Sequence, residues 1–266
     1  MHTAILQSLR LHIDAEKAIV LPRFFKTGEG EYGEGDKFMG VAVPHIRLVA
    51  KEYSHAPLEV VNRLLDSEWH ECRMCALLIL VMKYKKSTEE ERQAIFDLYL
   101  SRTERINNWD LVDLSAPNIV GEHLYSSTER TILYQLAESP LLWERRIAIV
   151  STLNFIRKGD FGDTFALADK LVDSRHDLMQ KAVGWMLREM GKRNISSFAS
   201  SSTNMPPPCL APCSAMPSKR WMPTNGTIGW EGGRNERIKK SGCVRLMGTH
   251  PLFLSRYQIH YFIKRT

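Results

Sequence analysis

Three features that the sequence lacks narrow the possibilities for this 266-residue chain. No apolar run approaches the ~20 residues that a membrane span needs, since the longest is about Cys75–Met82. Asp14 and Glu16 lie where a secretory signal needs its apolar segment, so we expect no signal and a cytoplasmic protein. The five cysteines, an odd number, do not indicate a disulfide framework.

Acidic residues are nearly absent from the C-terminal part of the chain. Residues 196–266 contain two acidic residues and ten Lys or Arg, a net charge of +8, whereas residues 1–195 have a net charge of −2. Seven of the twelve prolines also lie beyond residue 195. The overall charge of +6 therefore belongs to the C-terminal part, and the composition places a domain boundary near residue 195.

Apolar residues in 1–195 recur at helical rather than alternating spacing, as in Cys75, Leu78, Ile79 and Met82. The polar segment 85–91 separates two such patterns and ends in three glutamates, which is typical of a helix start with an acidic first turn. The sequence therefore predicts an all-α body.

Helix starts recur along this body at similar intervals, near Trp69, Trp109, Trp143 and residues 178–181. A period of roughly 35 to 45 residues with two helices per unit predicts an antiparallel helix-pair solenoid, because each pair buries its apolar face only against its neighbour. One helix of each repeat would then line a concave surface, among them the helices that carry Trp109 and Trp185. A plain helical bundle with coincidental spacing is the alternative.

Two short motifs have plain structural explanations. Gly28–Gly33 fits the three-glycine dinucleotide pattern, but Glu29, Glu31 and Glu34 would repel a pyrophosphate, so we interpret the segment as a connecting loop. Cys72–Cys75 has CxxC spacing inside a helical apolar pattern, without a second ligand pair at zinc-finger spacing. We interpret these cysteines as core residues, and we expect no metal.

The segment Asn107–Asp113 is more informative. Either of its first two asparagines can cap a helix, and Trp109 and Asp113, four residues apart, then share one helix face. An indole face and a carboxylate together attract a cation, through a cation–π energy of ~0.5–2 kcal/mol and a Coulomb energy of ~4 kcal/mol. A structural hydrogen-bonded pair is the alternative.

Two further segments place basic groups beside tryptophans. Arg145 and Arg146 lie at a predicted helix start, where guanidinium groups suit phosphate contact. Lys181, Trp185 and Arg188 fall on a common helix face. Together they predict a nucleic-acid groove with a cationic subsite, and core tryptophans with solvated arginines are the competing interpretation.

Four stretches of the sequence resemble a known family, the HEAT-like-repeat DNA alkylation repair glycosylases of the AlkD type. They are Phe24–Val41, Ile106–Pro117, Trp143–Ile149 with Phe155–Gly159, and Lys181–Glu189, and the resemblance covers essentially all of 1–195. It implies an all-α, HEAT-like helical-repeat solenoid with a concave DNA-binding face, followed here by an irregular tail.

The resemblance also implies an activity, the hydrolytic removal of N3- or N7-alkylated purines from duplex DNA in base excision repair. The enzyme would be a monomer that needs no metal or cofactor and does not flip the base. Asp113 would oppose the charge of an oxocarbenium-like sugar and orient a water, while Trp109 and Trp185 would pack against the deoxyribose. The residues expected to contact DNA, with Arg146 holding a phosphate, are Arg146, Arg145, Lys181 and Arg188.

Two other functions stay open at this point. A non-catalytic helical-repeat DNA-binding protein would use the same basic surface without releasing a base. A protein-interaction scaffold would use the tryptophans as hot spots for a peptide.

The tail, 196–266, departs from the family pattern, whose members finish with a helix pair containing a run like Met-Pro-Arg-Thr-Met-Leu-Arg-Tyr-Ala-Ile-Glu. Codons exist for Pro208–Lys219 such that the frame starting at the third base of the Pro208 codon encodes that run. We therefore expect 196–266 to be a frameshifted, disordered tail. The body, 1–195, would then lack its last helix pair and expose apolar surface at that end.

Overall fold

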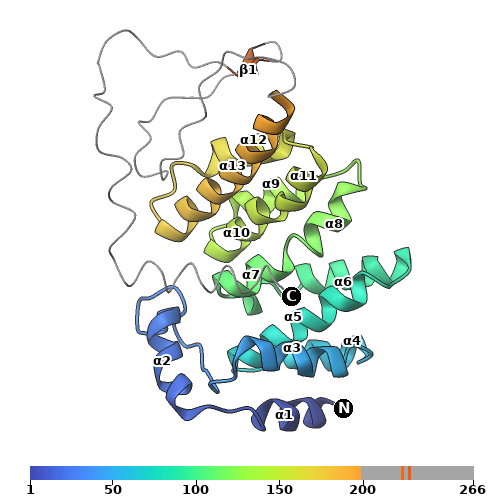
Figure 1. Ribbon diagram of the computed structural model, residues 1–266, viewed down its shortest axis with the longest axis vertical. Helices are drawn as coiled ribbons and strands as arrows, with labels where there is room; N and C mark the ends of the chain where they lie inside the picture. Colours follow the sequence, from blue (N-terminus) through green and yellow to red (C-terminus); the bar gives the residue numbers. More distant parts are fainter. Residues whose placement is uncertain (199–222, 225–226, 229–266) are drawn as a thin grey trace. The chain divides into compact units, whose positions relative to one another are not determined.

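The computed structural model describes residues 1–198, 223–224 and 227–228, with side chains described through Arg193. The chain divides into two units, Met1–Arg220 and Trp221–Thr266, which are considered separately. In the second unit, the described residues are two short antiparallel strands, β1 (Pro223–Thr224) and β2 (Thr227–Ile228). The described elements of the first unit are helices, so the predicted all-α class is confirmed (Figure 1).

The helices of the first unit follow one another along the chain. They are α1 (His2–Arg10), α2 (Ala15–Phe25), α3 (Val43–Glu52), α4 (Leu58–Leu65), α5 (His70–Tyr84), α6 (Glu89–Leu100), the 3-10 turn η1 (Thr103–Arg105), α7 (Trp109–Ser115), α8 (Val120–Tyr125), α9 (Thr131–Glu138), α10 (Leu142–Ser151), α11 (Leu153–Lys158), α12 (Gly162–Leu171) and α13 (Asp177–Phe198). Within the described part of the chain, no helix has the length and apolar character needed to cross a membrane.

Capping side chains set several of these bounds. The Asp14 carboxylate accepts backbone N–H groups in the first turn of α2. Thr88 and Glu91 form a reciprocal capping box at the start of α6, where the sequence predicted a helix start. Asn108 caps α7, and Gly159 ends α11 in the left-handed conformation that glycine adopts without strain. The helix boundaries thus follow local hydrogen bonding.

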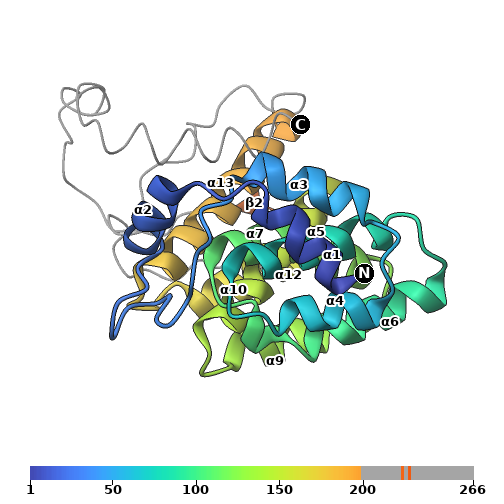
Figure 2. The same ribbon diagram turned by 90° about the horizontal axis from the view of Figure 1, so that it is seen from below.

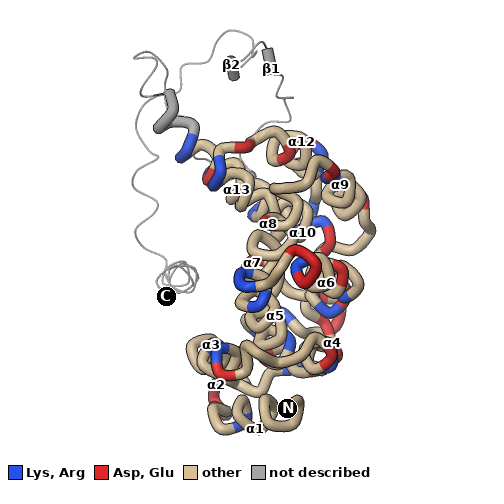
Figure 3. Tube along the Cα trace, turned by 90° about the vertical axis from the view of Figure 1, so that its right-hand side faces the viewer, with Lys and Arg blue, Asp and Glu red and all other residues tan. Residues whose placement is uncertain are grey.

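The first unit is a stack of helices in which α5 packs on α7, α7 on α10, and α10 on α13. Figure 3 shows α5, α7 and α13 along one side of the stack, and α4, α6, α9 and α12 along the other. Helices α5, α7, α10 and α13, which we call the site row, begin close to the residues whose spacing predicted the repeat. The helical-repeat prediction is confirmed.

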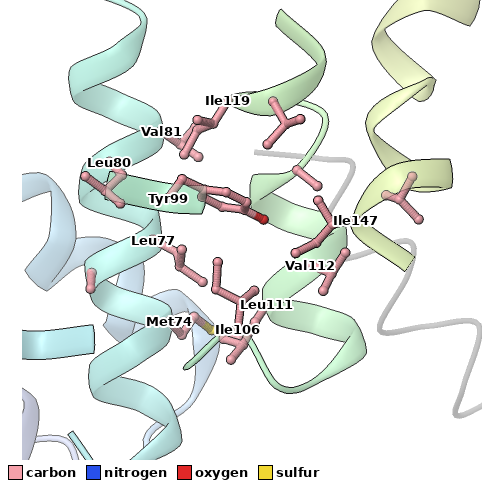
Figure 4. Packing of buried hydrophobic residues seen from close by; sticks show 14 of the residues in the cluster. Met74, Leu77, Leu80, Val81, Tyr99, Ile106, Leu111, Val112, Ile119 and Ile147 are labelled. Carbon is pink, nitrogen blue, oxygen red and sulfur yellow. The ribbon is translucent and has the colours of Figure 1, made fainter. Parts of the chain in front are cut away.

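A buried apolar core holds α7 in the middle of the site row (Figure 4). Leu111 and Val112 of α7 and Ile147 of α10 are fully buried, and burying each such side chain stabilises the fold by ~1.5–3 kcal/mol. Tyr99 of α6 reaches α7, where its hydroxyl hydrogen-bonds Ser115 Oγ at 2.9 Å. Residues on the other face of α7 are therefore presented from a fixed backbone.

A buried carboxylate ties the chain between α2 and α3 to α5. Glu71 accepts hydrogen bonds from the backbone N–H groups of Met39, Gly40 and Val41 at 3.0, 2.8 and 3.2 Å. Gly40 has a φ of 87°, and a Cβ there would lie 2.1 Å from the carbonyl oxygen of Asp14. This contact, which we call the Glu71 clip, fixes the chain's path close to α2, and only glycine fits at its centre.

The interpretations of Cys72–Cys75 as core residues and of Gly28–Gly33 as a connecting loop are confirmed. Cys72 and Cys75 are fully buried in the core, and burial raises the pKa of their thiols to about 11 and about 12. Gly28–Gly33 lies in the loop after α2 instead of joining a strand to a helix.

The predicted boundary at residue 195 falls within α13, which continues to Phe198. The predictions of a frameshift and of disorder concern 196–266, most of which lies outside the described residues.

Candidate active site

Trp109 is the first residue of α7 and is half-buried against the end of α2. Its backbone N–H donates to Asn108 Oδ1 at 2.9 Å, as expected for a capped helix start. Its indole stacks on Phe25 with 5.4 Å between ring centroids, and the Phe24 ring meets it edge-on at 6.0 Å. The α2 aromatics therefore brace the indole, while part of it stays accessible.

Asp113 lies one turn further along α7 and forms a two-point ion pair with Arg146 of α10. Arg146 Nε donates to Oδ1 and Nη2 to Oδ2, both at 2.9 Å, and each side chain is 6% exposed. Arg146 Nη1 also donates to the carbonyl oxygen of Leu178 at 2.6 Å. One guanidinium thus fixes α7, α10 and the first turn of α13 around the carboxylate.

This pairing leaves hydrogen-bonding capacity unused on both groups. A carboxylate offers about four acceptor positions, of which Arg146 occupies two on Asp113. A guanidinium carries five N–H donors, of which the contacts of Arg146 to Asp113 and Leu178 use three. Asp113 can therefore accept a further hydrogen bond or oppose a positive charge without leaving its arginine.

A cluster of cationic groups lies beside this pair, around His176 at the start of α13. Burial lowers the pKa of His176, Asp177 raises it, and the charges of Arg145, Lys26 and Arg146 lower it further. Lys26, directly after α2, and Arg145 and Arg146 of α10 therefore all act electrostatically on the His176 ring. Asp113 and Asp177 offset part of this charge, and the remaining excess of positive charge suits a polyanion.

The loop after α2 brings Lys26 to this place. Tyr32 in the loop packs edge-on against Trp143 of α10 and His176, with centroids 5.9 and 6.4 Å apart. Lys26 Nζ lies 5.7 Å from the centroid of the Tyr32 ring, and Figure 2 shows the loop running beside α10. A Cβ on Gly33 would lie 2.6 Å from the carbonyl oxygen of Phe25, so glycine allows the loop to fold back on α2.

The remaining predicted residues lie on α13. Trp185 is half-buried and packs against the core, one turn after Lys181. Lys181 is exposed and pairs with Asp177 at 2.8 Å, and Arg188 is exposed. The structure therefore brings Asp113 and Arg146 into direct contact, whereas Lys181 is joined to a carboxylate of its own helix.

Several residues beside the site were missed in the sequence, namely Phe24, Phe25, Lys26, Tyr32 and His176. The stretch Phe24–Val41 carried the family resemblance, but nothing in the order of residues shows that this loop reaches α10 and α13. Arg146 was expected on a phosphate, and the structure places its guanidinium on Asp113. Among the described residues, no three His, Cys, Asp or Glu side chains are grouped so as to hold a metal ion.

Comparisons with known proteins identify the fold and the family of this chain. The chain is similar to a solved structure described as a predicted DNA alkylation repair enzyme from Enterococcus faecalis, with a TM-score of 0.52 and 19% identity over 71% of this chain and 88% of that one. No curated protein matches the sequence. A family model described as DNA alkylation repair enzyme matches residues 5–200, about three quarters of the chain. The chain therefore belongs to the DNA alkylation repair enzyme family and has a role in DNA alkylation repair.

Proposed function

We propose that this chain is an alkylpurine DNA N-glycosylase that excises cationic N3- or N7-alkylated purines from duplex DNA, as the first step of base excision repair. The observation that carries the proposal is the Asp113–Arg146 pair, which lies one helical turn from the half-buried Trp109. An accessible indole and an oriented carboxylate on one helix face form a subsite for a positive charge.

The reaction needs little more than such a subsite. Alkylation at N3 or N7 makes the base cationic, so the electron pair of the breaking C1′–N9 bond neutralises the base as it leaves. Asp113 opposes the positive charge that develops on the sugar and orients a water, whose oxygen forms the new bond to C1′ while its proton passes to solvent. Trp109 and Trp185 pack against the deoxyribose, and the base is not flipped.

The DNA backbone runs, in this proposal, along the cationic cluster beside the site. Arg145, Lys181 and Arg188 supply charge at the starts or faces of α10 and α13, and Lys26 adds a cation from the loop. Arg146 holds Asp113 and directs its two remaining N–H groups to a phosphate. Backbone contacts of this kind position the duplex and leave lesion choice to the chemistry of the glycosidic bond.

Incubation of the protein with a duplex containing a single N7-methylguanine tests the proposal, with free base measured by chromatography under single-turnover conditions. Release of N7-methylguanine, and no release from the same duplex with guanine, is the expected result. Salt-sensitive binding without release would show a non-catalytic DNA-binding protein instead. Absence of any duplex binding would favour a scaffold for a protein partner.

A further inference from the structure

A buried charged network lies directly behind Trp109 and takes no part in the reaction described above. His70, the first residue of α5, is 2% exposed. Its Nδ1 lies 2.8 Å from Asp36 Oδ2 in the loop after α2, and its Nε2 lies 2.8 Å from Asp110 Oδ2 in α7. Ionised carboxylates only accept hydrogen bonds, so both ring nitrogens donate and the ring is an imidazolium.

The titration of His70 agrees with this geometry. Burial alone lowers the pKa of His70, but the charges and hydrogen bonds of Asp110 and Asp36 outweigh it and raise the pKa to about 9. Arg73 of α5 is the other charged group in the network and binds Asp36. His70 and Arg73 therefore carry the two positive charges of the network, and Asp36 and Asp110 carry the two negative charges. The end of α2 contributes the Phe25 ring.

The network holds the start of α7 on both sides of Trp109. Arg73 Nη2 donates to Asn107 Oδ1 at 3.0 Å, two residues before Trp109, and His70 binds Asp110, the residue after it. Arg73 Nη1 also donates to the carbonyl oxygen of Ser67 at 2.8 Å. The backbone that carries the indole is thereby clamped to α5 by side chains.

The aromatic rings continue this clamp to the indole itself. The His70 ring stacks on Phe38 at 4.5 Å and lies 5.0 Å from Phe25, and Phe25 in turn stacks on Trp109 at 5.4 Å. Four desolvated charges are a poor way to gain stability, because apolar residues of similar volume often do as well or better. What the charges add is a fixed direction for each contact.

We propose that His70, held as an imidazolium between Asp36 and Asp110, is a positioning residue that sets the Trp109 indole for the excision reaction. The inference rests on the proposed glycosylase function. When His70 loses its proton, it keeps one N–H donor for two carboxylates, so one of its two hydrogen bonds and the positive charge between Asp36 and Asp110 are lost, and the start of α7 shifts. Excision therefore depends on a group that does not touch the substrate.

Excision kinetics of His70→Gln test this inference. Glutamine reaches one carboxylate only, so we expect single-turnover excision of N7-methylguanine to fall by roughly ten- to a hundredfold, with duplex affinity little changed. His123→Gln is the matched control, since His123 is also stacked on a phenylalanine, Phe96 at 4.1 Å, and bonded to a side chain, Tyr84, on another part of the stack. The control variant should excise at the wild-type rate.

The pH profile separates positioning from a general loss of structure. Wild-type excision should fall as pH rises through about 9, where His70 loses its proton, and His70→Gln should lack this step; rates are corrected for base lost without protein. Unchanged excision in His70→Gln, or a step near pH 9 that persists in it, would overturn the proposal.

A spectroscopic measurement on the wild-type protein keeps the test valid if the variant does not fold. Carbon-13 labelled histidines report the His70 titration, and the indole N–H signal of Trp109, assigned with Trp109→Phe, should shift with the same midpoint. An indole N–H signal that does not shift as His70 titrates would contradict the inference. A wild-type protein that shows the coupled shift but releases no base would contradict the glycosylase proposal and not the coupling of His70 to Trp109.

Discussion

Two arginines join successive layers of the stack, and comparing them shows why only one belongs to the site. Arg146 holds one carboxylate, Asp113, in a pair that is nearly closed to solvent. Arg130, just before α9, is 21% exposed and binds both Asp160 and Asp163, at 2.8 and 2.6 Å. The same ion-pair chemistry therefore occurs in two regions of the first unit.

The difference lies in what else surrounds each carboxylate. On Asp163, Arg130 takes Oδ2 while the Tyr134 hydroxyl donates to Oδ1 at 2.6 Å, and the Arg130 guanidinium lies 4.5 Å from the Phe155 ring centroid. Each of these contacts holds neighbouring segments of the helical stack together. Asp113 has Arg146 as its ion-pair partner and shares its helix face with a half-buried indole. Asp113 and Asp163 each accept two hydrogen bonds, so the half-buried indole beside Asp113, more than the ion pair itself, distinguishes the site.

The largest expected effect comes from removing Arg146, and removal of Arg130 is the comparison. Arg146→Met leaves a buried carboxylate without its partner and should lower the free energy of unfolding by ~3–5 kcal/mol. Arg130→Met removes a more exposed group and should cost about 1 kcal/mol. Urea unfolding followed by circular dichroism measures both. Equal losses in the two variants would show that the burial of an ion pair does not determine how much its arginine contributes to the free energy of unfolding.

A smaller effect follows from pH. The pKa of His70 is raised from 6.5 to about 9 in the folded protein, so its contribution to stability is complete below pH 6.5 and disappears as pH rises through about 9. The loss amounts to roughly 3 kcal/mol. The Arg130 joint should not respond, because Asp160 and Asp163 outweigh burial and raise the pKa of that arginine.

Unfolding free energies of wild type and His70→Gln at pH 6 and pH 10 test this expectation. The difference between the two proteins should be largest at pH 6 and shrink at pH 10. A difference that stays constant with pH would show that His70 does not gain its proton affinity from the fold.

Excision should separate the two aspartates. Asp113→Asn should slow single-turnover release of N7-methylguanine by ~10² or more, which corresponds to ~2.7 kcal/mol in the barrier, because the amide opposes no positive charge. Asp163→Asn is the matched control, since it also removes a carboxylate paired with an arginine, and should leave the rate unchanged. An undiminished rate in Asp113→Asn would remove this residue from the mechanism.

The smallest expected effect concerns the exposed charge on α13. Lys181→Ala should lower duplex affinity modestly and reduce the slope of log affinity against log salt by about 1, as for the loss of one phosphate contact. Lys170→Ala on α12 is the control, because Lys170 is likewise paired with a carboxylate, Glu138. Identical salt slopes for both variants and the wild type would place Lys181 away from DNA.

Much of the fold could be predicted from the sequence because its signals are local. The glutamate run after Thr88 and the asparagine before Trp109 marked helix starts through backbone hydrogen bonds that the structure contains. The repeat spacing likewise identified the four helices of the site row, since each repeat buries its apolar face in the same way.

The contacts across the site were not predictable in the same way. The partnership of Asp113 with Arg146, and of His70 with Asp36 and Asp110, joins side chains about thirty to forty positions apart, and no local pattern selects among the many possible pairs. The frameshift proposed for 196–266 stays a prediction, and sequencing the gene through codons 190–225 tests it.

The Glu71 clip bears on how this chain tolerates change in length. One carboxylate fixes Met39–Val41, and Phe25 at the end of α2 is fixed by its own stacking. Between these anchors, Gly30 is exposed, with open space around it. Extra residues inserted there would lengthen an exposed loop, so related proteins should vary in size at this point, and an affinity tag grafted after Gly30 should leave the helices undisturbed.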